Sequence, residues 1–252
     1  MVSLIASIIG AISGIGGGII IKPALELISG HDTVVISFLS SCTVLSMAIV
    51  SLLHQRTTGG ELELRRGTAL AVGSVAGGGL GKYILDAAFE IWDNNLVGLI
   101  QSALLLLILI GLFLFSIKQD EMTPRNLQHR LQCMLLGGSL GLLSSFLGIG
   151  GGPMNLAVLF FFLGMNLKKA AIHSIYIILF SQTTSLFFTI LHHTVPSVSP
   201  ISLLNVVGGG VLGAIIGRTL AKKMKEQAVV ALYHSVLVLV TAITGINLLR
   251  YL

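Results

Sequence analysis

The sequence predicts an all-α polytopic membrane protein made of two inverted repeats. Each repeat is a glycine-broken, re-entrant helical hairpin followed by three transmembrane helices. Three observations predict it: the composition, an internal repeat and the distribution of basic residues. Of 252 residues, 54% are hydrophobic and 10% are charged, whereas soluble domains carry about 25% charged residues. So few charges cannot form a soluble surface, which excludes the soluble, disordered and nucleic-acid-binding classes.

Eight apolar segments follow one another along the chain, and each is long enough to cross or deeply enter a membrane. They cover residues 2–28, 33–53, 67–86, 95–117, 131–164, 170–191, 199–221 and 228–250. The longest polar connection, 118–130, lies at the middle of the chain. We therefore expect a first transmembrane repeat at 1–117, a cytoplasmic linker at 118–130 and a second transmembrane repeat at 131–252.

The two halves carry the same motifs at nearly the same spacing. The string Gly14–Gly18 (GIGGG) recurs as Gly148–Gly152, an offset of 134 residues. Ser40 and Ser174 keep this offset. A glycine ladder recurs as well, at an offset of 136, and a basic residue follows it each time. Its members are Gly73, Gly77 and Gly81 before Lys82, and Gly209, Gly213 and Gly217 before Arg218. Two patterns at similar offsets favour gene duplication over chance.

The basic residues decide how these segments cross the membrane. With Lys22 left out, eight full spans would put seven basic residues on each face, which conflicts with the positive-inside rule. If segments 2–28 and 131–164 are re-entrant hairpins instead, twelve of fifteen basic residues share one face, which we take as cytoplasmic. The length of segment 131–164 also favours a hairpin. As one helix it would measure about 51 Å, whereas the hydrocarbon core of a bilayer is about 30 Å thick. Three crossings per half invert the second repeat and leave both chain ends outside.

Paired breaks in inverted repeats are typical of transporters. Each glycine string frees backbone N–H groups, and the helix after it points its positive end at the break. Two such tips would meet near the bilayer middle and form an anion site. The expected substrate-binding residues are Ser13, Gly16, Gly17, Gly18, Lys22, Ser40, Thr43, Ser145, Gly150, Gly151, Gly152, Asn155, Ser174 and Gln182.

Each of these residues also has a structural interpretation. The glycines could serve close helix packing alone, and Lys22 could extend toward the outer surface instead of facing an anion. The serines and threonines could join helices or bond to their own backbone. For the glycine ladders, packing is the favoured interpretation.

Enzyme and cofactor motifs fail on inspection. GIGGGI lacks the last glycine of a dinucleotide fingerprint, and residues 76–82 lack the first glycine and the final Ser/Thr of a P-loop. Cys42 and Cys133 form no disulfide framework or metal motif. We therefore expect no catalytic residue, cofactor or metal. We also count no carboxylate within the membrane segments, which argues against a cation as substrate.

With these motifs placed, the whole chain resembles the sulfite exporter TauE/SafE family of bacterial membrane transporters. The resemblance rests on G-x-G-G-G opening each half, on Pro23 five residues after Gly18, and on the glycine ladders. Lys22 departs from the family, whose members are usually apolar there, as does Pro153 directly after the second glycine string. The resemblance implies export of sulfite or organosulfonates across the bacterial inner membrane.

We therefore expect a secondary transporter that exports small sulfur-containing anions by alternating access around the two tips. The alternatives are a transporter of another small solute and a non-transporting membrane assembly factor. The expected partners are a small anionic substrate and the lipid bilayer, without nucleic acid, and a homodimer is left open.

Overall fold

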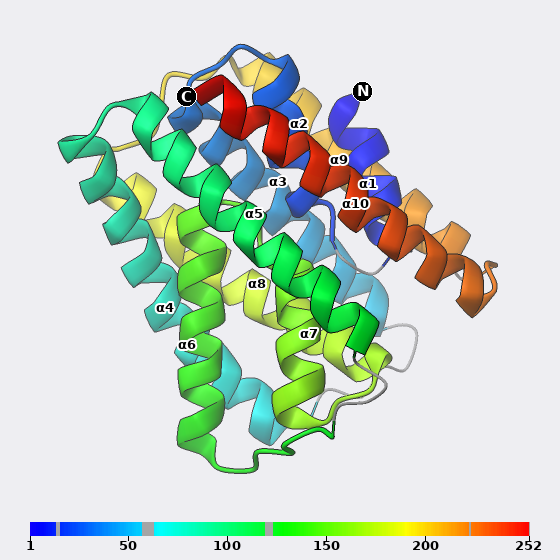
Figure 1. Ribbon diagram of the computed structural model, residues 1–252. Helices are drawn as coiled ribbons and strands as arrows, with labels where there is room; N and C mark the ends of the chain where they lie inside the picture. Colours follow the sequence, from blue (N-terminus) through cyan, green and yellow to red (C-terminus); the bar gives the residue numbers. More distant parts are fainter. Residues whose placement is uncertain (14–15, 57–62, 119–122, 222, 252) are drawn as a thin grey trace.

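The computed structural model describes residues 1–13, 16–56, 63–118, 123–221 and 223–251, and these residues form helices without any strand (Figure 1). The all-α prediction is therefore confirmed. The helices are α1 (Val2–Ile12), α2 (Gly18–Ile28), α3 (Thr33–Arg56), α4 (Leu64–Ile91), α5 (Asn94–Lys118), α6 (Arg130–Leu147), α7 (Gly152–Leu163), α8 (Leu167–Leu191), α9 (Pro200–Ala221) and α10 (Glu226–Tyr251).

Within the described chain, six helices are long and apolar enough to cross a membrane. Six spanning helices agree in number with the predicted three crossings per half, but they are not the same six segments. Helix α6 is included, since its 18 residues measure about 27 Å. Helix α4 is absent from the six, although it has 28 residues. Helix α6 is thus nearly as long as the bilayer is thick, although the sequence predicts it as one half of a re-entrant hairpin.

The two expected breaks lie where the sequence places them. In the second half, α6 ends at Leu147 and α7 begins at Gly152. Gly148 and Gly151 flank this break with φ angles of 65° and 66°, in the left-handed region that favours glycine. Pro153 follows in the first turn of α7, where its missing N–H removes no helical hydrogen bond. Local sequence therefore dictates that the helix stops and restarts here.

The hairpins pack across the two halves. Helix α1 lies along α9 and α6 lies along α4. The glycine ladders make this possible: a side chain added at Gly77 would overlap the α6 backbone at Gly138, and one added at Gly213 would overlap α1 at Leu4. The ladders thus serve close packing, as expected, and the halves interlock. Figure 1 also shows α1 and α6 entering the bundle from opposite ends, as inverted repeats would. The inverted relation itself stays a prediction.

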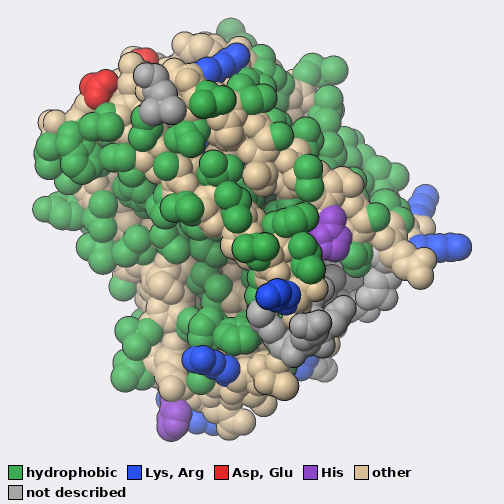
Figure 2. Space-filling view, viewed as in Figure 1, with side chains coloured by type: hydrophobic (Ala, Val, Ile, Leu, Met, Phe, Trp, Pro, Cys, Tyr) green, Lys and Arg blue, Asp and Glu red, His purple; other side chains and the backbone are tan. Residues whose placement is uncertain are grey.

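One end of the bundle gathers basic residues. There Arg66 donates to the carbonyl oxygen of Leu163 (3.3 Å), and Lys169 forms an ion pair with Glu63 (3.1 Å). The hydrogen bond from the Lys169 ammonium holds the pKa of Glu63 below its usual value. In Figure 2, hydrophobic side chains cover much of the visible face, and most visible Lys and Arg lie in its lower half and at its right edge.

The opposite end holds both chain termini (Figure 1). There Thr33 Oγ1 donates to the carbonyl oxygen of Asn94 (3.2 Å), and Arg250 donates to the carbonyl oxygen of Leu27 (2.8 Å). Helix α2 therefore ends beside the start of α5 and the end of α10. The first hairpin returns to this termini-bearing end, as a re-entrant element must.

Candidate functional site

The tips of the two hairpins meet at the centre of the protein. A side chain added at Gly18 would overlap the carbonyl oxygen of Ile149, so the two glycine strings are in direct contact. Val44 of α3 lies against both strings, because it would also meet a side chain added at Gly150. Val44 packs with Ile178 of α8 in one buried apolar cluster. These two residues are themselves 134 positions apart.

The first tip is tightly packed. A side chain added at Gly10 would overlap the backbone of Gly16 and Gly17, and one added at Gly17 would meet Ser7 and Met47. The hydroxyl of Ser13 donates to the carbonyl oxygen of Ile9 in its own helix (2.9 Å). Gly17 and Gly18 thus serve close packing, whereas a side chain added at Gly16, where φ is 81°, would meet nothing within 4 Å. The first two residues of the string, 14 and 15, lie outside the described residues.

The second tip is surrounded by buried polar side chains. Gln182 Nε2 donates to Ser144 Oγ (3.1 Å) and to the Ser144 carbonyl oxygen (3.3 Å). Asn155 Oδ1 lies 3.0 Å from the point where a Cβ at Gly151 would sit. Ser144 also borders Gly151, so Ser144, Gly151, Asn155 and Gln182 form one group, here called the second-tip cluster.

Several atoms of the second-tip cluster have no hydrogen-bond partner. Asn155 and Gln182 are both 0% exposed. Neither amide atom of Asn155 is bonded, and Gln182 Oε1 is also free. Leaving a buried polar group unpaired costs about 1–3 kcal/mol, and such exceptions in a folded protein call for an explanation. The cluster is therefore the strongest candidate for a binding site.

Only the second half carries this polarity. At an offset of 134 residues, the counterparts of Ser144, Asn155 and Gln182 are Gly10, Ile21 and Ala48. All three counterparts lack a polar side chain. The two tips are therefore chemically different: the first is closely packed at Gly17 and Gly18, and the second presents hydrogen-bonding groups.

The start of α7 adds an electrostatic contribution at the same place. Gly151 is the N-cap of this 12-residue helix, and the Asn155 N–H donates to the Gly151 carbonyl oxygen (2.8 Å). The positive end of the helix therefore faces the second-tip cluster. A helix N-terminus carries roughly half a positive charge, which favours an anion beside it.

Lys22 is buried between the two hairpins. The residue is 2% exposed, so its side chain does not extend to the surface. Its ammonium donates to Gln101 Oε1 (2.6 Å) and to the carbonyl oxygen of Leu147 (2.7 Å). Leu147 is the last residue of α6, so Lys22 caps the negative end of that helix. The lysine thereby ties the first hairpin to the second, directly before the second glycine string.

Glu26 corrects the prediction that the membrane segments hold no carboxylate. Its side chain is 3% exposed and lies 3.9 Å from the Lys22 ammonium. Asn247 Nδ2 donates to Glu26 Oε2 (3.2 Å). The argument against a cation substrate from missing carboxylates is therefore wrong. The described residues contain no group of three or more His, Cys, Asp or Glu side chains that could hold a metal ion.

The remaining predicted residues lie on α3, α6 and α8 and are buried. Thr43 bonds to its own helix at the carbonyl oxygen of Leu39 (2.7 Å), and Ser145 donates to the carbonyl oxygen of Ser181 (3.4 Å). Ser40 is buried with its hydroxyl unpartnered, and Ser174 is buried as well. Among these, Ser145 is next in sequence to the second-tip cluster.

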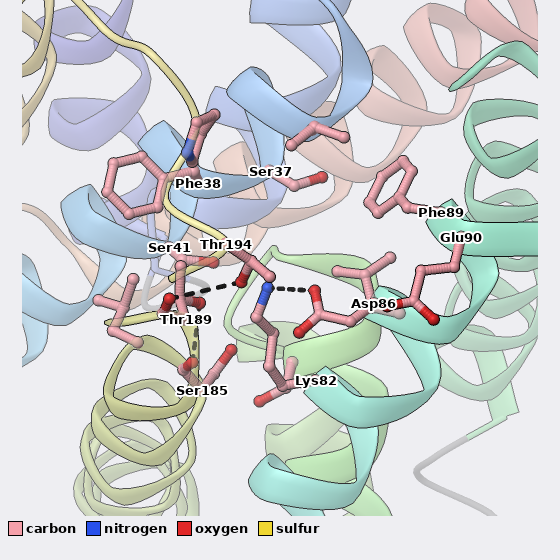
Figure 3. Close-up of a pocket in the computed structure, with 15 residues that line it drawn as sticks. Ser37, Phe38, Ser41, Lys82, Asp86, Phe89, Glu90, Ser185, Thr189 and Thr194 are labelled. Atoms are coloured by element: carbon pink, nitrogen blue, oxygen red, sulfur yellow. Dashed lines mark hydrogen bonds and ion pairs between the residues drawn. The ribbon is translucent and has the colours of Figure 1, made fainter. Parts of the chain in front are cut away.

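A cavity of about 170 Å³ opens near the second tip, between α3, α4, α8 and the segment after α8. Figure 3 shows the Lys82 ammonium directed at Asp86, with which it forms an ion pair at 2.5 Å. Ser145 also lines the cavity, which therefore reaches the residue beside the second-tip cluster. We call this cavity the vestibule. It lies toward the end of the bundle that holds both chain termini, since it is lined by the first part of α3 and the last part of α4.

The vestibule is hydroxyl-rich but not positively charged. Its polar lining includes Ser37, Ser41, Ser145, Ser185, Thr189 and Thr194. Its charged lining residues are Lys82, Asp86 and Glu90, which give one negative charge in excess. It therefore suits the passage of a small polar solute better than the retention of an anion. In the sequence, Lys82 stands out only as the basic residue after the first glycine ladder; Asp86, one turn later, is the signal for the ion pair.

The sidedness of the vestibule can be tested by cysteine labelling. In a background with Cys42 and Cys133 replaced by alanine, Ser41→Cys should react with a small membrane-impermeant thiol reagent from the outer face. Lys223→Cys, on the basic end, should react only from the cytoplasmic face. Mass spectrometry of inside-out and right-side-out vesicles measures both. Labelling of the two cysteines from the same face would contradict the re-entrant topology.

Comparisons with known proteins agree with this architecture. The family model "Sulfite exporter TauE/SafE" matches residues 1–246. The "Probable membrane transporter protein YunE" of Bacillus subtilis (strain 168) is 23% identical over 268 residues, covering 95% of this chain and 93% of that protein. No solved structure gives a significant match.

Proposed function

Since this chain belongs to the sulfite exporter TauE/SafE family, and is thus a multi-pass membrane transporter and not an enzyme, we propose that it exports sulfite or a small organosulfonate. The substrate would bind at the second-tip cluster and leave through the vestibule. The two halves, as inverted repeats, would rock around the contact between their tips to expose the site to each face in turn. In one of the two states, the apolar side chains of Val44 and Ile178 would separate the second-tip cluster from one face of the membrane.

The observation that carries this proposal is the set of unpartnered buried amides at the second tip. Asn155 and Gln182 are fully buried, yet three of their four amide atoms have no hydrogen-bond partner. A small anion with acceptor oxygens, held at a helix N-terminus, would accept from the one free donor among them, the NH₂ group of Asn155. Serine hydroxyls in the vestibule would then replace its hydration during release.

Two electrostatic features support the export direction. The vestibule carries one negative charge in excess near the outer end, which disfavours entry of anions from outside and favours their release. The membrane potential, negative inside, contributes about 2.3 kcal/mol per charge per 100 mV to anion efflux. No coupled ion is required for net export.

The proposal is tested by efflux from proteoliposomes loaded with sulfite, an alkanesulfonate, an amino acid or a divalent cation. We expect efflux of the sulfur anions above that of protein-free vesicles, and faster efflux when the interior is made negative. Sulfur anion efflux equal to that of protein-free vesicles, with efflux of another solute, would assign a different substrate. Efflux of none of the four would favour the assembly-factor alternative.

A further inference from the structure

The second-tip cluster offers acceptors as well as donors, and this limits what it can bind. The amide of Asn155 presents one NH₂ group and one carbonyl oxygen, both buried and both unpartnered. This holds whichever way the amide is turned, since neither atom has a partner to fix its orientation. A fully deprotonated oxyanion has only acceptors. It would satisfy the Asn155 NH₂ and leave the carbonyl oxygen unpaired.

Gln182 strengthens the same point. Its Nε2 already donates to Ser144, while its Oε1 is buried and free. The cluster therefore has two unsatisfied carbonyl oxygens, on Asn155 and Gln182, against one unsatisfied NH₂ group, on Asn155. A ligand that satisfies the cluster must supply at least one hydrogen-bond donor of its own.

Among the described residues, the hydrogen bonds of the second-tip cluster join Gln182 to Ser144, and none of them involves a titratable side chain. Lys22 lies at the end of α6, directly before the second glycine string, and forms an ion pair with Glu26. The ammonium of Lys22 is engaged by Gln101 and Leu147. The positive end of α7 is then the main electrostatic attraction at the cluster, and it suits one negative charge better than two.

We propose that the ligand of the second-tip cluster is a singly charged oxyanion that carries an O–H group, which for sulfite means hydrogen sulfite and not the dianion. This inference rests on the proposed function and specifies its substrate. The O–H donates to the carbonyl oxygen of Asn155 while a neighbouring oxygen accepts from its NH₂ group, a paired contact that an acid makes with an amide. Asn155 and Gln182 then determine specificity, and their half-one counterparts, Ile21 and Ala48, take no part.

Two matched anions separate this proposal from simple anion binding. Methanesulfinate has the size and charge of hydrogen sulfite, with a methyl group in place of the hydroxyl, and does not change its charge near neutral pH. We expect it to bind the purified full-length protein at least about tenfold more weakly than sulfite at slightly acidic pH, because it leaves buried carbonyl groups unpaired. Isothermal titration calorimetry measures both affinities.

The pH series gives the second readout. The affinity for total sulfite should fall about tenfold per pH unit above the ionisation of hydrogen sulfite, whereas the affinity for methanesulfinate should stay constant. Methanesulfinate thereby controls for titration of the protein itself. Asn155→Leu keeps the side-chain volume and removes the amide. It should lower the affinity for sulfite to that for methanesulfinate. Ile21→Val, the matched change at the half-one counterpart, should leave both affinities unchanged.

Each alternative result has a distinct meaning. Equal affinity for the two anions, or sulfite affinity that rises with pH, would overturn the inference and leave sulfur anion transport in place. Binding of neither anion would overturn the proposed function together with the inference. If Asn155→Leu fails to fold, as thermal unfolding would show, Gln182→Met provides the same comparison from the other amide.

Discussion

Replacing Gly151 by leucine is expected to reduce sulfite efflux to the level of protein-free vesicles. Gly151 has a φ of 66°, and an added Cβ would lie 3.0 Å from Asn155 Oδ1. A leucine side chain would therefore fill the second-tip cluster and displace the amide of Asn155. The left-handed backbone adds about 1–3 kcal/mol of strain, which a protein of ordinary stability can tolerate. Efflux from proteoliposomes and thermal unfolding of the purified protein measure the two effects separately.

Gly111→Leu is the matched control, because nothing lies within 4 Å of a Cβ added at Gly111 of α5. This variant should transport like the unaltered protein. If Gly151→Leu unfolds, Gly151→Ala, which adds the Cβ alone, should still slow efflux severalfold. A folded Gly151→Leu protein with full efflux would place the substrate path elsewhere.

Replacing Lys22 by methionine is expected to destabilise the protein by about 3–5 kcal/mol, the usual cost of removing one partner from a buried ion pair. The change leaves Glu26 charged and buried, and it uncaps the Leu147 carbonyl at the end of α6. Denaturant titration in detergent measures the loss. Because Lys22 links the two hairpins, the second glycine string should also become more accessible to hydrogen exchange.

The double variant Lys22→Met/Glu26→Leu separates the charge from the packing. Removing both charges should recover much of the lost stability, since a buried ion pair often contributes little more than apolar residues of similar volume. The uncapped Leu147 carbonyl would remain, so recovery should be incomplete. Additive losses in the two single variants and the double variant would contradict the interaction between Lys22 and Glu26.

The helices and their breaks could be read from the sequence because they depend on local physics. Runs of apolar residues at bilayer length predict helices, and the repeated GIGGG predicts where two of them stop. The close packing at Gly77 and Gly213 also followed, because small residues every fourth position form a smooth helix face. These features need only the residues of one segment.

The asymmetry of the two tips could have been predicted, but the buried ion pair was missed. Aligning the halves at an offset of 134 sets Asn155 against Ile21 and Gln182 against Ala48, so the polar side was visible in the sequence. Glu26 lies four residues after Lys22, a spacing typical of ion pairs on one helix face. Apolar residues on both sides of Glu26 give its segment the pattern of one continuous apolar run. That Lys22 caps α6, 125 residues away, depends on tertiary packing that no local pattern encodes.

Counterflow of labelled sulfite tests most directly whether the second tip of this protein carries a sulfur anion across the membrane. Proteoliposomes preloaded with unlabelled sulfite should take up labelled sulfite transiently above the external concentration. Methanesulfinate outside should inhibit this uptake weakly, and the Gly151→Leu protein should show none of it. Uptake no greater than that of protein-free vesicles, or full uptake by folded Gly151→Leu, would contradict the account.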